Sequence, residues 1–114
     1  MPAFKTKAFS KWQKKELIKD RELMFAIEEI INGLMDADLG GGLVKKRIRR
    51  NGSGKRSGYR TLIATNKGNK WFFIYGFAKN ERHNIHEQEE RAFKQLAKDL
   101  LSLNNVQVNK AMKH

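Results

Sequence analysis

Five consecutive large apolar residues, WFFIY at residues 71–75, constrain the fold more than any other feature of the chain. Alternate side chains of a strand point to opposite faces of a sheet, so a strand through this run presents apolar side chains on both faces. Such a strand is typical of the centre of a sheet that is covered on both sides. One of these faces is expected to be covered by helices.

Two further strands are expected before this run, over residues 43–50 and 59–65, and the central strand itself over residues 70–77. A Gly-rich stretch and a tight Asn-rich turn connect the three strands. Such short connections make neighbouring strands antiparallel. Residues 4–9 are expected to form a short first strand.

Two helices are predicted between the first strand and the second. Ser10 and Gln13 have the spacing of a capping box and place the first helix over residues 11–19. Asp20 can cap the second helix, and three consecutive glycines at residues 40–42 end it in a flexible connection. The apolar residues of this second helix fall on one helical stripe: Leu23, Ile27, Ile30, Ile31 and Leu34.

A third helix is predicted near the end of the chain, where Asn84 and Glu87 repeat the capping spacing and apolar periodicity continues to about residue 103. Residues 104–114 contain too few apolar residues to predict an element and are expected to form a flexible tail. The order β-α-α-β-β-β-α describes a single α+β domain of residues 1–114. Its two N-terminal helices and one C-terminal helix pack on a small antiparallel sheet.

The positive charge of the chain is concentrated in its middle. The net charge is +12, but residues 1–38 contain seven basic and seven acidic residues, and residues 81–114 contain six and five. Residues 39–80 contain eleven basic residues and no acidic one. Like charges repel unless an anion neutralises them, so a polyanion, above all nucleic acid, is the expected partner. A basic surface that only keeps the protein soluble is the plain alternative, but it would not require the core strands to lack acids.

Metal, cofactor and cysteine chemistry have few residues to support them. The chain has no Cys, which excludes a disulfide framework, a thiolate zinc site and a cysteine nucleophile. His83 and His86 are three residues apart, but no cluster of acidic residues accompanies them, so neither a metal site nor a cofactor is expected. Gly54 and Lys55 are followed by Arg56 and a strand, whereas a nucleotide-binding loop continues with Ser or Thr and a helix.

Membrane association is also not expected. No apolar run approaches the roughly 18 residues of a membrane span, and the N-terminal residues MPAFKTKAF lack the apolar region of a signal peptide. A membrane-surface anchor would carry its basic residues on one face of an amphipathic helix, whereas here they lie on strand-like and Gly-rich sequence. The expected location is the cytoplasm.

Cleavage of RNA without a metal fits the residues that remain. The 2′-OH of RNA can serve as nucleophile, so the protein needs only cations for the charged transition state and groups that move two protons. The expected cations are Arg60, Lys79, Lys55, Arg56 and Arg82. The candidate proton-moving groups are Tyr59, Tyr75, His83 and a lysine surrounded by positive charge. Tyr75 can equally be a core residue, and His83 an exposed loop residue.

Two short strings resemble toxins of the RelE/ParE superfamily, in particular its HigB-like branch. The string GKRSGYR at residues 54–60 opens one expected strand, and YGFAKNE at residues 75–81 closes the next. The expected order of elements also matches the fold of that superfamily, and the resemblance extends over roughly residues 40–103.

The resemblance implies the toxin of a type II toxin–antitoxin pair, neutralised by a cognate protein antitoxin. RelE and HigB toxins are metal-independent ribonucleases that cut mRNA, typically within the ribosomal A site, by attack of the 2′-OH. In that case Arg60 corresponds to the strand arginine that binds the scissile phosphate, and Lys79 to the basic residue after the last strand. Lys55 and Arg56 match the loop that grips the RNA backbone.

One departure from the family concerns the general base. RelE-type members carry a catalytic tyrosine near the C-terminus, whereas residues 104–114 contain none. His83, His86 and Lys79 are the candidates that the resemblance leaves for this role.

Together these arguments predict two sets of site residues. The expected catalytic residues are Arg60, Lys79 and His83. The expected RNA-binding residues are Lys45, Lys46, Arg47, Lys55, Arg56, Tyr75 and Arg82. The expected partners are the antitoxin and mRNA in the ribosomal A site, with no membrane.

Two other functions are left open by the sequence. One is a ParE-like inhibitor of DNA gyrase that cuts nothing. The other is a non-catalytic RNA- or DNA-binding module whose exposed aromatic residues, Trp71, Tyr75 and Phe77, stack on bases.

Overall fold

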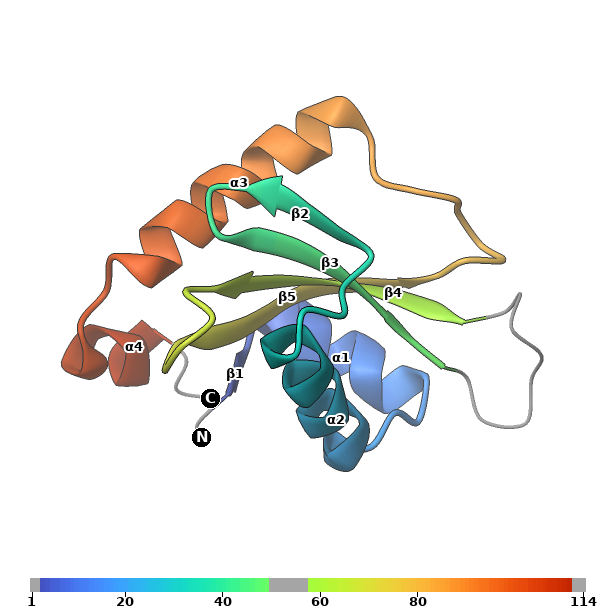
Figure 1. Ribbon diagram of the computed structural model, residues 1–114, viewed down its shortest axis with the longest axis horizontal. Helices are drawn as coiled ribbons and strands as arrows, with labels where there is room; N and C mark the ends of the chain where they lie inside the picture. Colours follow the sequence, from blue (N-terminus) through green and yellow to red (C-terminus); the bar gives the residue numbers. More distant parts are fainter. Residues whose placement is uncertain (1–2, 50–57, 112–114) are drawn as a thin grey trace.

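The computed structural model describes residues 3–49 and 58–111 and is an α+β fold, as predicted (Figure 1). The strands are β1 (Phe4–Lys5), β2 (Ala37–Gly40), β3 (Leu43–Ile48), β4 (Tyr59–Thr65) and β5 (Trp71–Ala78). The helices are α1 (Lys7–Lys15), α2 (Asp20–Ile31), α3 (Glu87–Leu101) and α4 (Asn105–Ala111).

The strands form one sheet in the order β1-β5-β4-β3-β2. β2, β3, β4 and β5 pair antiparallel with their neighbours, and β1 adds two residues parallel to β5. The predicted central strand, β5, lies between β4 and the short β1 rather than at the centre of the sheet, which is β4. Its residues Trp71, Phe72 and Phe73 are fully buried. The prediction that both faces of this strand are covered is therefore confirmed.

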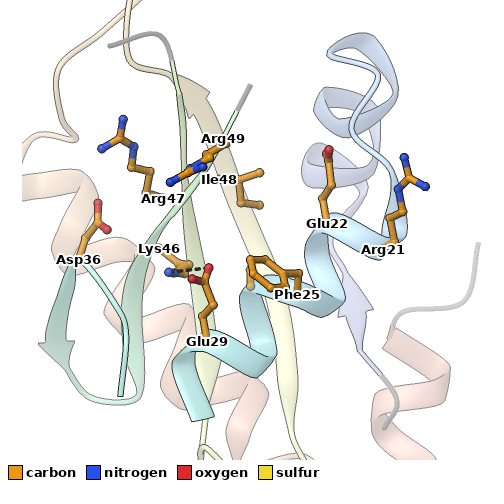
Figure 2. Close-up of a pocket in the computed structure, with 10 residues that line it drawn as sticks. Arg21, Glu22, Phe25, Glu29, Asp36, Lys46, Arg47, Ile48 and Arg49 are labelled. Carbon is orange, nitrogen blue, oxygen red and sulfur yellow. Dashed lines mark ion pairs between the residues drawn. The ribbon is translucent and has the colours of Figure 1, made fainter. Parts of the chain in front are cut away.

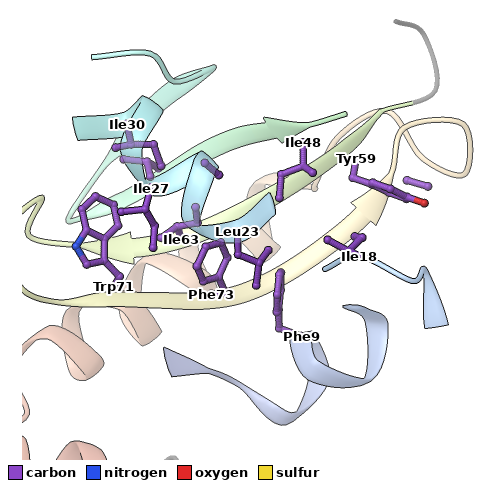
Figure 3. Packing of buried hydrophobic residues seen from close by; sticks show 13 residues of the cluster. Phe9, Ile18, Leu23, Ile27, Ile30, Ile48, Tyr59, Ile63, Trp71 and Phe73 are labelled. Carbon is purple, nitrogen blue, oxygen red and sulfur yellow. The ribbon is translucent and has the colours of Figure 1, made fainter. Parts of the chain in front are cut away.

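α1 and α2 cover one face of the sheet (Figure 1). Figure 3 shows the core between them and the sheet, where Phe9 of α1 and Leu23 and Ile27 of α2 meet Ile63 and Phe73. Burial of such large side chains contributes about 1.5–3 kcal/mol each. The apolar stripe of the second helix thus packs as predicted, except for Ile31 and Leu34, which are exposed.

The first helix begins four residues earlier than predicted. The side chain of Thr6 accepts a hydrogen bond from the backbone N–H of Phe9 at 3.1 Å, and Thr6 rather than Ser10 is the N-cap. The first strand therefore ends at Lys5 instead of residue 9. Thr6 also donates its hydroxyl to the carbonyl of Ile74 on β5 at 2.7 Å, a tertiary contact that local spacing does not reveal.

α3 covers the other face, but only partly. Its buried residues Ala97 and Leu100 pack with Leu43, Leu62 and Phe72 on that face. The helix begins after His86 rather than Asn84, because the Glu89 carboxylate accepts a hydrogen bond from the His86 backbone N–H at 2.8 Å. At the other end of α3, the ammonium group of Lys70 donates to the carbonyls of Leu101 and Leu103 at 3.0 and 2.7 Å.

Two elements were missed. α4 lies in the expected tail, where Val108 is buried in the same core cluster as α3. β2 lies where a flexible connection was expected after the second helix, which ends at Ile31. Gly40, Gly41 and Gly42 all have positive φ, which allows the chain to reverse tightly from β2 into β3. Within the described residues, no helix is long and apolar enough to span a membrane.

Candidate nucleic-acid interface

Among the described residues, no helix covers part of the sheet face beneath α3, and basic and aromatic side chains line this part. Strand alternation places Lys45, Arg47, Arg60, Tyr75 and Phe77 on this face. The α3 core cluster includes Tyr75 at its margin but not the other four. We call these five residues the open half of the sheet.

The register of the three strands arranges the open half in two rows. Arg60 on β4 lies between Arg47 on β3 and Phe77 on β5, and the next row holds Lys45, Leu62 and Tyr75. Like charges directly opposite one another destabilise a sheet. The repulsion between Arg47 and Arg60 therefore destabilises the sheet, and an anion bound between them would offset this repulsion.

One acidic side chain holds Arg60 in place. The Asp36 carboxylate, which precedes β2, lies 3.0 Å from Nε of Arg60, and only 12% of the Arg60 side chain is exposed. Even so, Nη1 of Arg60 and Nε of Arg47 are buried and have no hydrogen-bond partner in the described part of the chain. Buried donors almost always find a partner, so these two nitrogens are the candidate donors for an anion bound on this face.

A hydrogen-bond network around Arg82 forms the border of the open half on the β5 side. Arg82 donates from Nη1 to Oε2 of Glu89 at 3.2 Å and from Nη2 to Oε1 of Glu89 at 2.5 Å. Nη1 also donates to the Tyr75 hydroxyl at 3.3 Å, and the guanidinium lies 5.6 Å from the centre of the Phe77 ring. The Arg82 side chain and the His86 N–H lower the pKa of Glu89 from its ordinary 4.5 to about 2, and Glu89 raises the pKa of Arg82.

The loop between β5 and α3 brings the remaining predicted residues near this face. Lys45 donates to the side-chain carbonyl of Asn84 at 3.5 Å, which ties the loop to β3. Lys79 is half-buried, and its backbone N–H donates to the carbonyl of Gly58 at 3.1 Å. His83 is exposed. Neither the Lys79 nor the His83 side chain hydrogen-bonds to a residue in the ranges that the structure describes.

Lys46 does not belong to this face. It points to the opposite side of β3, where its ammonium group lies 3.1 Å from Glu29 of α2 and only 8% of its side chain is exposed (Figure 2). The prediction of Lys46 as an RNA-binding residue is therefore wrong, because alternation along the strand separates it from Lys45 and Arg47. The predicted Lys55 and Arg56 lie outside the described residues.

A cavity of about 790 Å³ lies along the edge of β3 beside α2 (Figure 2). Phe25 and Ile48 provide its apolar wall, and Arg47 and Arg49 are among its basic residues. Arg47 lines both this cavity and the open half, so the two surfaces adjoin.

The aromatic residues expected to stack on bases differ in position. Trp71 is fully buried on the α1 and α2 face, and Phe77 is only 4% exposed. Both therefore support the sheet, and the prediction that they are exposed is wrong. Tyr75 is half-buried and packs between Phe77 and Phe93, with ring centres 6.1 and 5.2 Å away.

Two acidic residues of the site were not predicted. Asp36 and Glu89 hold Arg60 and Arg82 respectively, yet each lies far from its partner in sequence or across a loop. The sequence gives no signal that singles them out, because Asp38 and Glu81, not Asp36 and Glu89, are the acidic residues next to the acid-free stretch. Among the described residues, no group of three His, Asp or Glu side chains is placed to hold a metal ion.

Comparison with known proteins agrees with the resemblance carried by the two strings. A search among curated proteins found no match. A family model described as the RelE toxin of the RelE/RelB toxin–antitoxin system matches residues 1–114. The superfamily assignment is confirmed, and the HigB-like branch stays a prediction. The chain therefore belongs to the RelE toxin family of toxin–antitoxin systems.

Proposed function

We propose that this toxin is a metal-independent endoribonuclease that cleaves mRNA presented in the ribosomal A site. The observation that carries the proposal is the pair Arg47 and Arg60, which face each other on the open half and each have a buried nitrogen without a hydrogen-bond partner among the described residues. A phosphodiester has the charge and the acceptor oxygens that these nitrogens lack. The acid-free composition of residues 39–80 favours the same ligand.

The proposed reaction uses the 2′-OH of the substrate as the nucleophile. Arg60 and Arg47 stabilise the charge that develops on the phosphoryl oxygens, and Lys79 and His83 are the predicted catalytic residues of the neighbouring loop. Removing one such donor typically costs about 2.7–4 kcal/mol, or 10²–10³ in rate. Lys45, Lys55, Arg56, Tyr75 and Arg82 are proposed to bind the flanking RNA.

Membership of the family implies a protein antitoxin as partner. We propose that the antitoxin neutralises the toxin by covering the open half, because a partner placed there excludes RNA from Arg47 and Arg60. An acidic segment would match the charge of this face.

Cleavage in a purified translation system tests the proposal. RNA 5′ ends are mapped after incubation with the unmodified protein, with Arg60→Ala and with Lys14→Ala. Lys14 is exposed on α1, the layer that covers the opposite face, so its variant loses the same charge away from the site. Cuts in register with codons, present with the unmodified protein and Lys14→Ala but absent with Arg60→Ala or without ribosomes, are expected.

Intact mRNA in the presence of folded protein would overturn the proposal. A supercoiling assay with DNA gyrase then separates the ParE-like alternative from simple nucleic-acid binding. If cuts persist with Arg60→Ala, the protein is still a nuclease, but its catalytic site lies outside the open half.

A further inference from the structure

We propose that Tyr75 is the general acid of the reaction, that Arg82 orients its hydroxyl group, and that Glu89 positions Arg82. This inference rests on the proposed RNA cleavage and adds the group that protonates the leaving 5′-oxygen. The sequence leaves Tyr75 as one of several candidate proton-moving groups, and the predicted site places it among the RNA-binding residues.

The position of Tyr75 is the first argument. The chain has two tyrosines, and the other, Tyr59, is 4% exposed and packs against Trp12 on the opposite face. Tyr75 lies one row from Arg60 on the adjacent strand, a diagonal separation of about 7–8 Å between backbones that side chains of this length can span. Phe77 lies opposite Arg60, its ring is beneath the Arg82 guanidinium, and it packs against the Tyr75 ring. Arg60, Tyr75 and Arg82 therefore surround one aromatic ring.

The hydrogen-bond direction at Tyr75 is the second argument. Arg82 can only donate, so the Tyr75 oxygen accepts in the 3.3 Å contact and its own proton is free for another acceptor. An acceptor on the open half would be a substrate oxygen. After the proton leaves, the adjacent guanidinium carries the charge that stabilises the phenolate.

The third argument is that this geometry is fixed. Glu89 holds two nitrogens of Arg82 and also accepts from the His86 N–H, while the Tyr75 ring is stacked on Phe93 at 5.2 Å. A catalytic group works best when neighbouring residues hold it in its productive position. Lys79 and His83 lack such support, since their side chains bond to no other described residue.

The 2′-oxygen forms a bond to phosphorus and loses its proton to a base of the solvent or the site. The bond between phosphorus and the 5′-oxygen breaks, and its electron pair stays on the 5′-oxygen, which takes the proton of Tyr75. The products are a 2′,3′-cyclic phosphate and a 5′-hydroxyl, and the phenolate regains a proton from water.

A sulfur substitution in the leaving group tests this role. Two mRNAs are compared that differ only at the mapped cleavage position, where one carries the natural 5′-oxygen and the other a bridging 5′-sulfur. A thiol has a pKa of about 8.5, so a thiolate can leave without taking a proton from a general acid. Tyr75→Phe is expected to slow cleavage of the oxygen substrate about 10²- to 10⁴-fold and that of the sulfur substrate by less than about threefold.

Two further variants make the test specific. Lys14→Ala, on the helix that covers the opposite face, is the control and is expected to cleave both substrates like the unmodified protein. Glu89→Gln loosens Arg82 and is expected to slow the oxygen substrate by about tenfold or more, with the sulfur substrate largely restored. A merely structural role for Glu89 would slow both substrates equally.

The failure of this inference is distinguishable from failure of the proposed function. If the unmodified protein cleaves and Tyr75→Phe cleaves the oxygen substrate equally well, Tyr75 is not the acid while the nuclease stands. If Tyr75→Phe slows both substrates alike, its hydroxyl binds RNA without donating the proton, which also overturns the inference. If the unmodified protein cleaves neither RNA on ribosomes, the proposed function fails and the inference falls with it.

Discussion

Asp36 and Arg60 form an ion pair that crosses a strand: the Asp36 carboxylate, just before β2, lies 3.0 Å from Nε of Arg60 on β4, with β3 between them. The contact occupies one nitrogen of the guanidinium and leaves Nη1 without a partner among the described residues. Asp36 therefore fixes the arginine without using up its capacity to bind an anion.

Replacing Asp36 by alanine is expected to reduce mRNA cleavage about 10- to 100-fold, the rate equivalent of a charge-assisted hydrogen bond of about 1.5–3 kcal/mol. The measurement is the cleavage rate in the translation assay. Asp38→Ala is the control, because the Asp38 pair with Lys67 is about half-exposed and lies away from the open half. Unchanged cleavage by Asp36→Ala would show that Arg60 does not need this support.

Lys45 and Lys46 are neighbours on opposite faces, so their alanine variants are expected to differ in kind. Lys45→Ala should reduce the salt dependence of binding to single-stranded RNA by about 0.7 in logarithmic slope, the loss of one phosphate contact, with an unchanged melting temperature. Lys46→Ala leaves Glu29 without its partner and is expected to lower the free energy of unfolding by about 1–3 kcal/mol. The opposite pattern in binding and melting experiments would contradict the assignment of faces.

Gly76 allows α1 to pack closely on β5. A Cβ atom at this position would lie 2.2 Å from Cζ3 of Trp12, so the indole ring would have to move. Gly76→Ala is expected to lower the free energy of unfolding by about 1–3 kcal/mol, measured by denaturant titration. Gly68→Ala is the matched control, since its new Cβ would meet no atom closer than 3.5 Å, and equal destabilisation by both variants would refute the packing argument.

The lowered pKa of Glu89 predicts a pH dependence of stability. A carboxyl group with a pKa of about 2 in the folded protein and 4.5 when free binds fewer protons in the folded state. Its contribution is therefore fully present above pH 4.5 and is lost as the pH falls towards 2. The difference in unfolding free energy between the unmodified protein and Glu89→Gln should shrink over this interval.

Glu90→Gln is the control for this titration, because the Glu90 pair with Lys94 lies within one helix and is over one-third exposed. Glu90→Gln is expected to change the free energy of unfolding little, because an exposed ion pair contributes little to stability. A difference between the unmodified protein and Glu89→Gln that stays constant from pH 5 to pH 2 would show that the Arg82 pair does not stabilise the fold.

Sequence patterns predicted the elements whose side chains alternate or repeat over many residues. The apolar run of β5 and the stripe of α2 are such signals, and both pack as expected apart from Ile31 and Leu34. Where a boundary depends on a contact between distant segments, local spacing was insufficient. Thr6 rather than Ser10 caps α1 because Thr6 also bonds to Ile74, which is distant in sequence.

The candidate site shows the same division. Lys45, Arg47, Arg60 and Tyr75 lie on one face because strand alternation and register bring them there, and Arg82 of the following loop joins them through its hydrogen bond to Tyr75. Lys46 lies on the opposite face for the same reason, because adjacent side chains of a strand point to opposite faces of the sheet. The roles of Asp36 and Glu89 arise from tertiary ion pairs, which charge counts along the chain do not predict.

The fastening of α3 at both ends has a consequence for the RNA binding proposed above. Lys70 holds the carbonyls after its last turn, and Glu89 in its first turn holds Arg82 of the preceding loop. The helix cannot slide along the sheet without breaking one of these contacts, so the width of the uncovered surface is set before RNA arrives. Association then requires little ordering of the protein, and the binding energy is available for holding the phosphate against the arginines.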